Sequence, residues 1–239
     1  MIQNCDCIEF LRSLADDSVD LILTDPPYSS GGFTRSDRNL KTSTKYQNTG
    51  TMDMKPVFYG DNRDQRSLTM WLYAWMKEGF TKVKDGGMMM CFIDWRNISC
   101  VIDAGQMAGY VYQGIVPWIK PNARPMKGIF RNQCEYVVCF VKGGTPQIET
   151  YANGYFMGMP LPTAKRLHST EKPVELLEFL MTFVPKGGYV VDPFSGSGST
   201  GEAAYRMGLE FDGCELSKEY ASIANERLGA VRCQPMLEL

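Results

Sequence analysis

The sequence predicts an α/β fold built on a mostly parallel sheet. Short apolar runs, rich in β-branched residues, alternate along the chain with segments whose apolar residues recur at helical spacing. Two of the apolar runs end in an acid followed by proline, at Asp25 and Asp192. Strands that alternate with helices are typical of parallel sheets.

In chain order, residues 1–4 predict a short strand, and Asp6 with Glu9 resembles a capping box that begins a helix through Leu14. The apolar run 19–24 predicts a buried strand. Residues 29–62 show little apolar periodicity and many Gly, Ser, Thr and Asn residues. A loop of this length inside a compact domain is either functional or a disordered surface excursion, and both interpretations are open.

Helical spacing returns at residues 68–80, and Gly86-Gly87 is expected to end that unit before a strand over 88–93. A second helix near 98–107 precedes strands over 111–119 and 136–141. After an irregular stretch, Pro173 opens another helix. A strand over 188–192, a helix through residues 203–207 and a strand over 211–215 follow.

The length of 239 residues fits a single domain over 1–239, with basic loop insertions near 29–62, 120–131 and 143–168. No apolar segment is long enough to cross a membrane and the N-terminus lacks a basic signal region, so we expect a cytoplasmic protein. The eight cysteines contain no C-x-x-C pair, and His168 is the single histidine. We therefore expect reduced thiols and no metal site.

Charge is unevenly distributed along the chain. Residues 1–28 carry one basic and six acidic side chains, whereas residues 117–172 carry eight basic and three acidic ones. A polyanion would be met by the middle of the chain, although a solvated surface explains any single block equally well.

The stretch Asp25-Pro26-Pro27-Tyr28 is the first candidate site. The prolines fix φ and remove two N–H donors, which leaves free backbone carbonyls beside a carboxylate and an aromatic ring. Two acceptors and a flat face suit a ring that carries an exocyclic amino group. The alternative is an ordinary strand-to-loop turn with a capping aspartate.

The second candidate site is a glycine-rich turn between a strand and a helix. The spacing Gly196-x-Gly198-x-x-Gly201, followed by Glu215 at the end of the next strand, suits a nucleoside whose ribose hydroxyls meet the carboxylate. The turn alone leaves three interpretations open: NAD, another adenosine cofactor without phosphate, or no ligand at all.

Together, Asp-Pro-Pro-Tyr and the later Asp-Pro-Phe-x-Gly-x-Gly resemble the β group of S-adenosylmethionine-dependent DNA amino-methyltransferases, across nearly the whole chain. The resemblance implies a Rossmann-like methyltransferase fold: a mostly parallel twisted sheet with helices on both faces and a circularly permuted motif order. It implies that Asp25, Pro26, Pro27 and Tyr28 are catalytic. It also implies a cofactor site formed by Asp6, Thr170, Lys172, Asp192, Phe194, Ser195, Gly196, Ser197, Gly198, Thr200, Glu215 and Leu216. Members often have proline after the histidine that precedes the Thr-x-Lys-Pro run, whereas this chain has Ser169, so no role is assigned to His168.

The expected reaction is methylation of the N6 amino group of an adenine flipped out of double-stranded DNA. Asp25 and the Pro26 carbonyl would each accept one N–H of that group, while Tyr28 would stack on the base. The family uses Asp-Pro-Pro-Tyr more often for adenine than for cytosine N4. Cytosine, RNA and a protein glutamine amide remain alternatives, as do an NAD-dependent oxidoreductase and a non-catalytic DNA-binding subunit.

Basic residues of the three loops are the expected DNA contacts. They are Arg35, Arg38, Lys41, Lys45, Arg124, Lys127, Arg131, Lys165 and Arg166. The sequence shows no separate recognition domain and leaves open whether the protein acts as a monomer or a homodimer.

Overall fold

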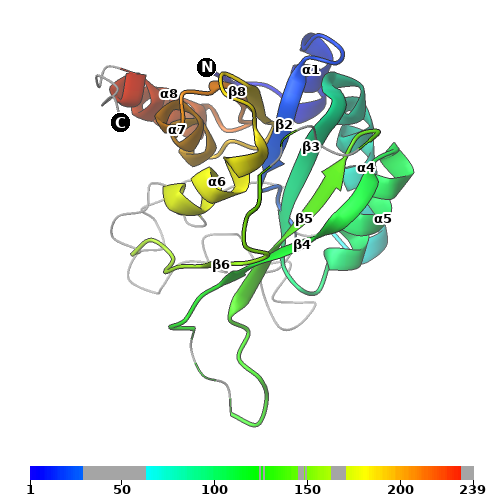
Figure 1. Cartoon of the computed structure of the whole chain (residues 1–239), viewed down its shortest axis with the longest axis vertical. Helices are drawn as coiled ribbons and strands as arrows, with labels where there is room; N and C mark the ends of the chain where they lie inside the picture. Colours follow the sequence, from blue (N-terminus) through cyan, green and yellow to red (C-terminus); the bar gives the residue numbers. More distant parts are fainter. Residues whose placement is uncertain are drawn as a thin grey trace.

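The computed structural model describes residues 1–28, 63–123, 125, 127–144, 148, 150–162 and 171–232, and its strands join in one sheet (Figure 1). The strands are β1 (Ile2–Gln3), β2 (Val19–Thr24), β3 (Val83–Ile93), β4 (Val111–Ile119), β5 (Cys134–Val141), β6 (Phe156–Met157), β7 (Tyr189–Asp192) and β8 (Glu210–Cys214). The helices are α1 (Cys7–Ser13), α4 (Gln65–Lys82), α5 (Ile98–Ala108), α6 (Val174–Leu180), α7 (Ser199–Arg206) and α8 (Lys218–Arg232), with a 3₁₀ turn, η2 (Met181–Phe183).

The sheet order is β1-β8-β7-β2-β3-β5-β4-β6. The five strands from β1 to β3 in this order run parallel, and only β5 is antiparallel to its neighbours, β3 and β4. β6 pairs in parallel with the end of β4. The predicted mostly parallel sheet is therefore confirmed, with one antiparallel strand, β5, between β3 and β4.

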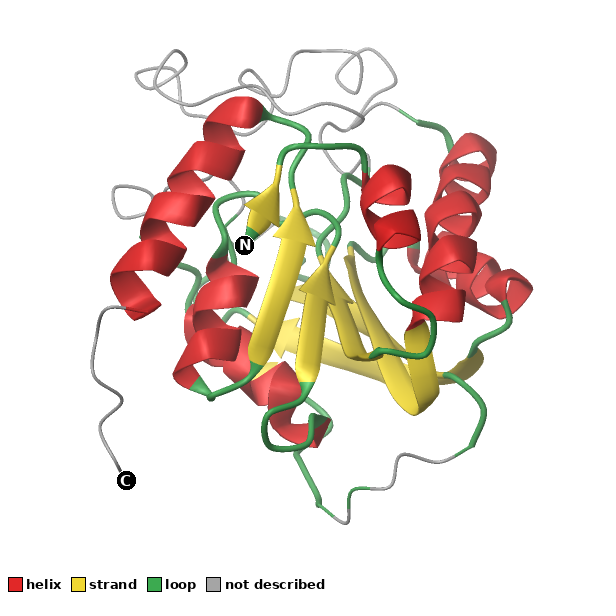
Figure 2. Ribbon diagram, turned by 90° about the horizontal axis from the view of Figure 1, so that it is seen from above, coloured by secondary structure: helices red, strands yellow, loops and turns green. Residues whose placement is uncertain are grey.

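Helices cover both faces of the sheet, as Figure 2 shows. One buried cluster joins α1, α4 and α5 to the sheet, and a second joins α6, α7 and α8 to the other face. In β2, alternate residues enter different clusters: Ile22 packs in the first, and Leu21 and Leu23 pack in the second. A strand buried on both faces reads as a continuous apolar run, which explains the signal at residues 19–24.

Several local expectations differ from the structure. β3 begins at Val83, directly after α4 ends, so Gly86-Gly87 lies inside the strand and not at the end of the helical unit. The pairing of β2 with β3 shifts register between Val19 and Leu21, opposite the segment with Gly86 at φ 78°. Glycine within a strand often marks such a bulge, and the sequence pattern for a helix end is similar. The expected helix after Pro173 is α6, and Pro173 is its N-cap and not its first helical residue.

The prediction left out two elements. α8 follows β8 and packs against α7 and β1. The two-residue strand β6 lies in a stretch expected to be irregular. Its main-chain pairing with β4 depends on a partner distant in sequence, which local periodicity does not report.

Three further observations concern membrane helices, cysteines and metal ligands. No helix within the described ranges is both long and apolar enough to cross a bilayer. The seven cysteines that the structure describes are free thiols. Among the same residues, no cluster of three or more His, Cys, Asp or Glu side chains is suited to hold a metal ion.

Candidate functional site

The two sequence motifs meet at adjacent strands. Asp25 follows β2, and Asp192 is the last residue of β7. The two strands pair in parallel, with Ile22 beside Val191. The Thr24 hydroxyl donates to Asp192 Oδ1 at 2.6 Å across 168 residues of sequence. From this pair the chain proceeds in opposite directions, to β8 on one side and to β3 on the other. Such a switch point is where open α/β sheets bind ligands.

Asp192 shapes the glycine turn from inside the protein. Its Oδ1 also accepts the Phe194 N–H at 3.0 Å, and the residue is only 2% exposed. Burial raises its pKa to about 6, although hydrogen bonds from Thr24, Thr200 and the Phe194 N–H oppose the rise. Its carboxylate therefore orders the backbone of the turn.

The turn itself requires glycine. Gly196 and Gly198 have φ values of 51° and 81°. A Cβ at position 198 would also lie 3.0 Å from the Ala224 Cβ in α8. The missing side chain at position 198 allows α8 to pack closely against the turn.

Other predicted cofactor residues stabilise this turn. Ser195 donates to the Asp192 carbonyl at 2.8 Å, and Ser195, Ser197 and Thr200 are all buried. Phe194 packs edge-on between Trp71 and Trp75, with ring centroids 5.4 Å apart in each pair. The α4 tryptophans carried no sequence signal beyond helical periodicity, so this contact was missed.

Glu215 faces the turn from the end of β8. Its carboxylate accepts the N–H groups of Gly196 at 3.0 Å and Ser217 at 2.8 Å, while burial raises its pKa. Asn4 donates to the backbone carbonyls of Glu215 and Leu216 at 2.9 and 3.0 Å. β1 thus brings the N-terminal segment to the same edge of the sheet.

Asp6 lies at this edge as the N-cap of α1. It accepts the Ile8 N–H at 2.9 Å, so the predicted start of the helix is correct. The Leu216 side chain is exposed. The contacts of both residues with a cofactor stay predictions.

Asp25 stands in an unusual polar environment. Its Oδ2 accepts a hydrogen bond from the Lys172 ammonium, whereas its Oδ1 is buried without a hydrogen-bond partner in the described structure. Burial raises its pKa, Lys172 opposes this rise and Glu135 adds to it. An unsatisfied buried carboxylate oxygen is costly and marks the place for a donor.

The rest of the tetrapeptide is held firmly. Pro26 is buried, and Pro27 and Tyr28 are half-buried. The Tyr28 carbonyl accepts a hydrogen bond of 2.8 Å from Asn97, a buried residue that follows β3. A single asparagine between a strand and a helix has no distinctive pattern, so the sequence alone does not indicate Asn97.

Lys172 contacts Asp25, although the resemblance implies a place for it near the methionine carboxylate of the cofactor. Its role toward the cofactor stays a prediction. Its neighbour Glu171 is buried and pairs with Arg227 of α8 at 2.7 Å. Arg227 also pairs with Glu202 of α7 and donates to the Ser197 carbonyl at 3.4 Å. This network fixes the Lys172 segment to the glycine turn.

The predicted DNA contacts are only partly described. Lys127 and Arg131 are exposed in the connection between β4 and β5, which extends away from the sheet in Figure 1. Phe130 in the same connection is 97% exposed. The other predicted DNA contacts lie outside the described residues, and they are Arg35, Arg38, Lys41, Lys45, Arg124, Lys165 and Arg166. The predicted cofactor residue Thr170 also lies outside them.

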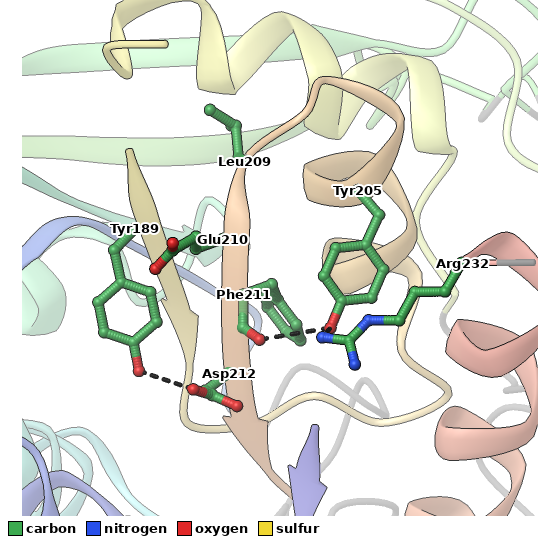
Figure 3. Close-up of a pocket in the computed structure, with 7 residues that line it drawn as sticks. All are labelled: Tyr189, Tyr205, Leu209, Glu210, Phe211, Asp212 and Arg232. Carbon is green, nitrogen blue, oxygen red and sulfur yellow. Dashed lines mark hydrogen bonds between the residues drawn. The ribbon is translucent and has the colours of Figure 1, made fainter. Parts of the chain in front are cut away.

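A cavity of about 330 Å³ lies elsewhere, beside the first residues of β7 and β8 (Figure 3). Tyr189 donates to Asp212 at 3.0 Å and Arg232 donates to the Tyr205 hydroxyl at 2.5 Å, so four of the lining residues already bind one another. The cavity is at the opposite ends of the strands from Asp25 and Asp192 and is not part of the candidate site. Its lining is Tyr189, Tyr205, Leu209, Glu210, Phe211, Asp212 and Arg232.

A glycine turn, a carboxylate placed for ribose hydroxyls and an unsatisfied acidic corner at one switch point define an α/β protein with a site of the nucleoside-binding class. Comparison with known proteins is more specific. The model of the N6_N4_Mtase family, described as DNA methylase, matches residues 19–226. The chain belongs to this family, and the predicted family and fold are confirmed.

Individual relatives span nearly the whole chain. The type II methyltransferase M2.DpnII of Streptococcus pneumoniae is 27% identical over 253 residues, which cover 96% of this chain and 90% of that protein. The crystal structure of the M1.HpyAVI–SAM complex is similar with a TM-score of 0.67 and 25% identity, covering 95% of this chain and 99% of that one. The cytosine-N4-specific PvuII DNA methyltransferase has a TM-score of 0.71 at 17% identity, covering 97% and 92% respectively, which shows a shared fold.

Proposed function

We propose that this DNA methyltransferase transfers a methyl group from S-adenosylmethionine to the N6 amino group of an adenine flipped out of double-stranded DNA. The observation that carries the proposal is the buried Asp25 Oδ1, which lacks a donor in the described structure and lies beside the glycine turn. An exocyclic amino group is the donor that such an acceptor requires. Methylation of cytosine N4 is the second candidate, favoured by the shared fold with a cytosine-N4-specific enzyme.

The cofactor of the chain is S-adenosylmethionine. The residues at the turn fit it, because Glu215, bound to the Gly196 N–H, presents a carboxylate whose oxygens each retain a lone pair for a ribose hydroxyl. When bound, the cofactor supplies an electrophilic methyl group on a sulfonium. We infer that Glu215, Asp6 and the 194–198 backbone bind its nucleoside part.

The chain's own contribution to the reaction is to orient the amine. Conjugation with the ring makes an exocyclic amine a poor nucleophile. Asp25 and the Pro26 carbonyl would each accept one N–H, directing the lone pair toward the incoming methyl group for in-line transfer. Extrusion of the base costs a few kcal/mol, and stacking on Tyr28 would offset part of that cost.

Double-stranded DNA is the proposed polymer partner. The exposed Lys127 and Arg131 on the projecting β4–β5 connection are placed to contact phosphates if DNA approaches the carboxyl edge of the sheet. Formation of a homodimer stays a prediction, which sedimentation with and without DNA would test.

The decisive experiment incubates the protein with methyl-labelled S-adenosylmethionine and unmodified DNA, then identifies the labelled nucleoside by mass spectrometry. N6-methyladenine is the expected product, and N4-methylcytosine would establish the second candidate. DNA without label would refute both.

A variant then tests the proposed role of Asp25. We expect Asp25→Ala to lower the rate of methyl transfer by roughly 10²–10³-fold while cofactor affinity stays close to that of the wild type. Loss of both together would mean that Asp25 holds the cofactor or the fold. Asp16→Ala, which removes an exposed ion-paired aspartate, is the control.

A further inference from the structure

Asp25 belongs to a group of four alternating charges in which Lys172 is buried and the other three side chains are half-buried. Lys172 pairs with Asp25 and also lies 3.6 Å from Glu135 Oε2, and Lys120 pairs with Glu135 Oε1. The four side chains come from the corner after β2, the segment before α6, β5 and the residue after β4. Their formal charges cancel, which allows them to share a site with little access to water.

The two carboxylates of this group have the same pattern of bound and unbound oxygens. Each has one oxygen bound by a lysine and one buried oxygen, Asp25 Oδ1 or Glu135 Oε2, without a hydrogen-bond partner in the described structure. Lys172 lies between them, over the Phe92 ring at 4.9 Å from its centroid. Moving its ammonium by less than about 1 Å would give Glu135 a full charge-assisted hydrogen bond.

Methyl transfer would make the position of the Lys172 ammonium beside Asp25 less favourable. In the proposed transfer the N–C bond would form as the S–C bond breaks, leaving a neutral thioether. The target amine, which the proposed function places against Asp25, would carry positive charge until its surplus proton passes to solvent. An ammonium on the same carboxylate opposes that charge. Lys120 is held at Glu135 and over the Trp118 ring at 4.3 Å from its centroid, so Glu135 stays in place as a second acceptor.

We propose that Glu135 is a positioning residue that takes over the Lys172 ammonium when the target amine binds Asp25. The proposal rests on the proposed function. Two further titratable groups face Asp25: Asp192 and the buried thiol of Cys91, whose pKa burial raises further out of the neutral range. Burial disfavours the charge of Lys172, yet Asp25 and Glu135 together raise its pKa, so it stays cationic.

The first test is a titration of the DNA-free protein. Carboxyl-¹³C NMR, with the Asp25 signal assigned by Asp25→Asn, follows the pKa of Asp25 in the wild type, Glu135→Gln and Lys172→Met. Because Lys172 lowers that pKa and Glu135 raises it, Lys172→Met is expected to raise the pKa and Glu135→Gln to lower it. Shifts in the same direction, or none in Glu135→Gln, would overturn the proposal.

The second test measures single-turnover methyl transfer against pH. Glu135→Gln is expected to lower the plateau rate roughly tenfold, the loss expected when one charge-assisted hydrogen bond is misdirected, with unchanged DNA affinity. Its acid limb should move to lower pH, whereas that of Lys172→Met should move to higher pH. Glu135→Asp should recover part of the plateau.

The controls separate the possible failures. Lys82→Met removes a nearly buried, ion-paired lysine at the other end of the strands and should leave both limbs unchanged. If Lys172→Met fails to fold, the isosteric Glu135→Gln decides the question alone. A wild type that methylates no DNA would overturn the proposed function, whereas an active wild type with a wild-type plateau in Glu135→Gln would overturn the role of Glu135.

Discussion

Asp192→Asn should stabilise this protein at neutral and alkaline pH. Asp192 is 2% exposed, and burial raises its pKa from the ordinary value of 3.8 to about 6. An acid whose pKa is higher in the folded state binds its proton more tightly when folded. Ionisation of Asp192 therefore weakens folding as the pH rises from about 4 to about 6.

The magnitude follows from the pKa shift. About two pKa units at 1.36 kcal/mol each amount to about 3 kcal/mol of lost stability above pH 7. Asparagine resembles the protonated acid: its oxygen can still accept from the Thr24 hydroxyl and the Phe194 N–H. For a chain of this size, a gain of that order raises Tm by roughly 6–12 °C.

The assay is urea unfolding of the wild type and Asp192→Asn at pH 8, 6 and 4. The advantage of the variant should be largest at pH 8 and should disappear near pH 4, where the wild-type carboxyl is protonated. Asp16→Asn, at an exposed ion-paired position, should give no gain at pH 8. A gain that is independent of pH, or a variant less stable than the wild type at pH 8, would refute the argument.

Three further predictions follow from other contacts. Arg227→Met should destabilise the fold by about 3–5 kcal/mol in chemical unfolding because it removes an ion-pair partner of the buried Glu171 and one of the two arginines that pair with Glu202. Asn97→Leu, which removes the hydrogen bond to the Tyr28 carbonyl, should reduce single-turnover methyl transfer more than it reduces cofactor affinity; an equal loss in both would assign Asn97 to the cofactor site. Replacing Lys127 and Arg131 together by alanine should weaken DNA binding and lower the slope of log K against log salt by about 2, and an unchanged slope would remove the β4–β5 connection from the interface.

Much of the architecture was predictable because periodicity is a local signal. The core helix α4 and the buried strand β2 followed from the spacing of their apolar residues. The start of β3 did not, since glycines can end a helix or form a bulge and only the pairing with β2 decides between them.

The candidate site was predictable where a motif carries it and unpredictable where distant contacts carry it. Asp25 and the glycine turn belong to recognisable short patterns. Glu135, by contrast, lies in a strand without any flanking pattern, and its importance comes from Lys172, 37 positions later in the chain. Charged residues that meet only through tertiary structure leave no mark on sequence periodicity.

The neighbouring positions of β2 and β7 also constrain how the enzyme is made. Chains fold progressively as they leave the ribosome, so β2 and its acidic corner emerge long before β7. Ile2 of β1 can pair with Gly213 only after β8 has been synthesised. A translation product that ends before β7 would carry the Asp25 corner, yet it would lack β7, the glycine turn and β8, where we propose that the methyl donor binds. Premature termination would therefore remove the proposed cofactor site, and we expect such a chain not to methylate DNA.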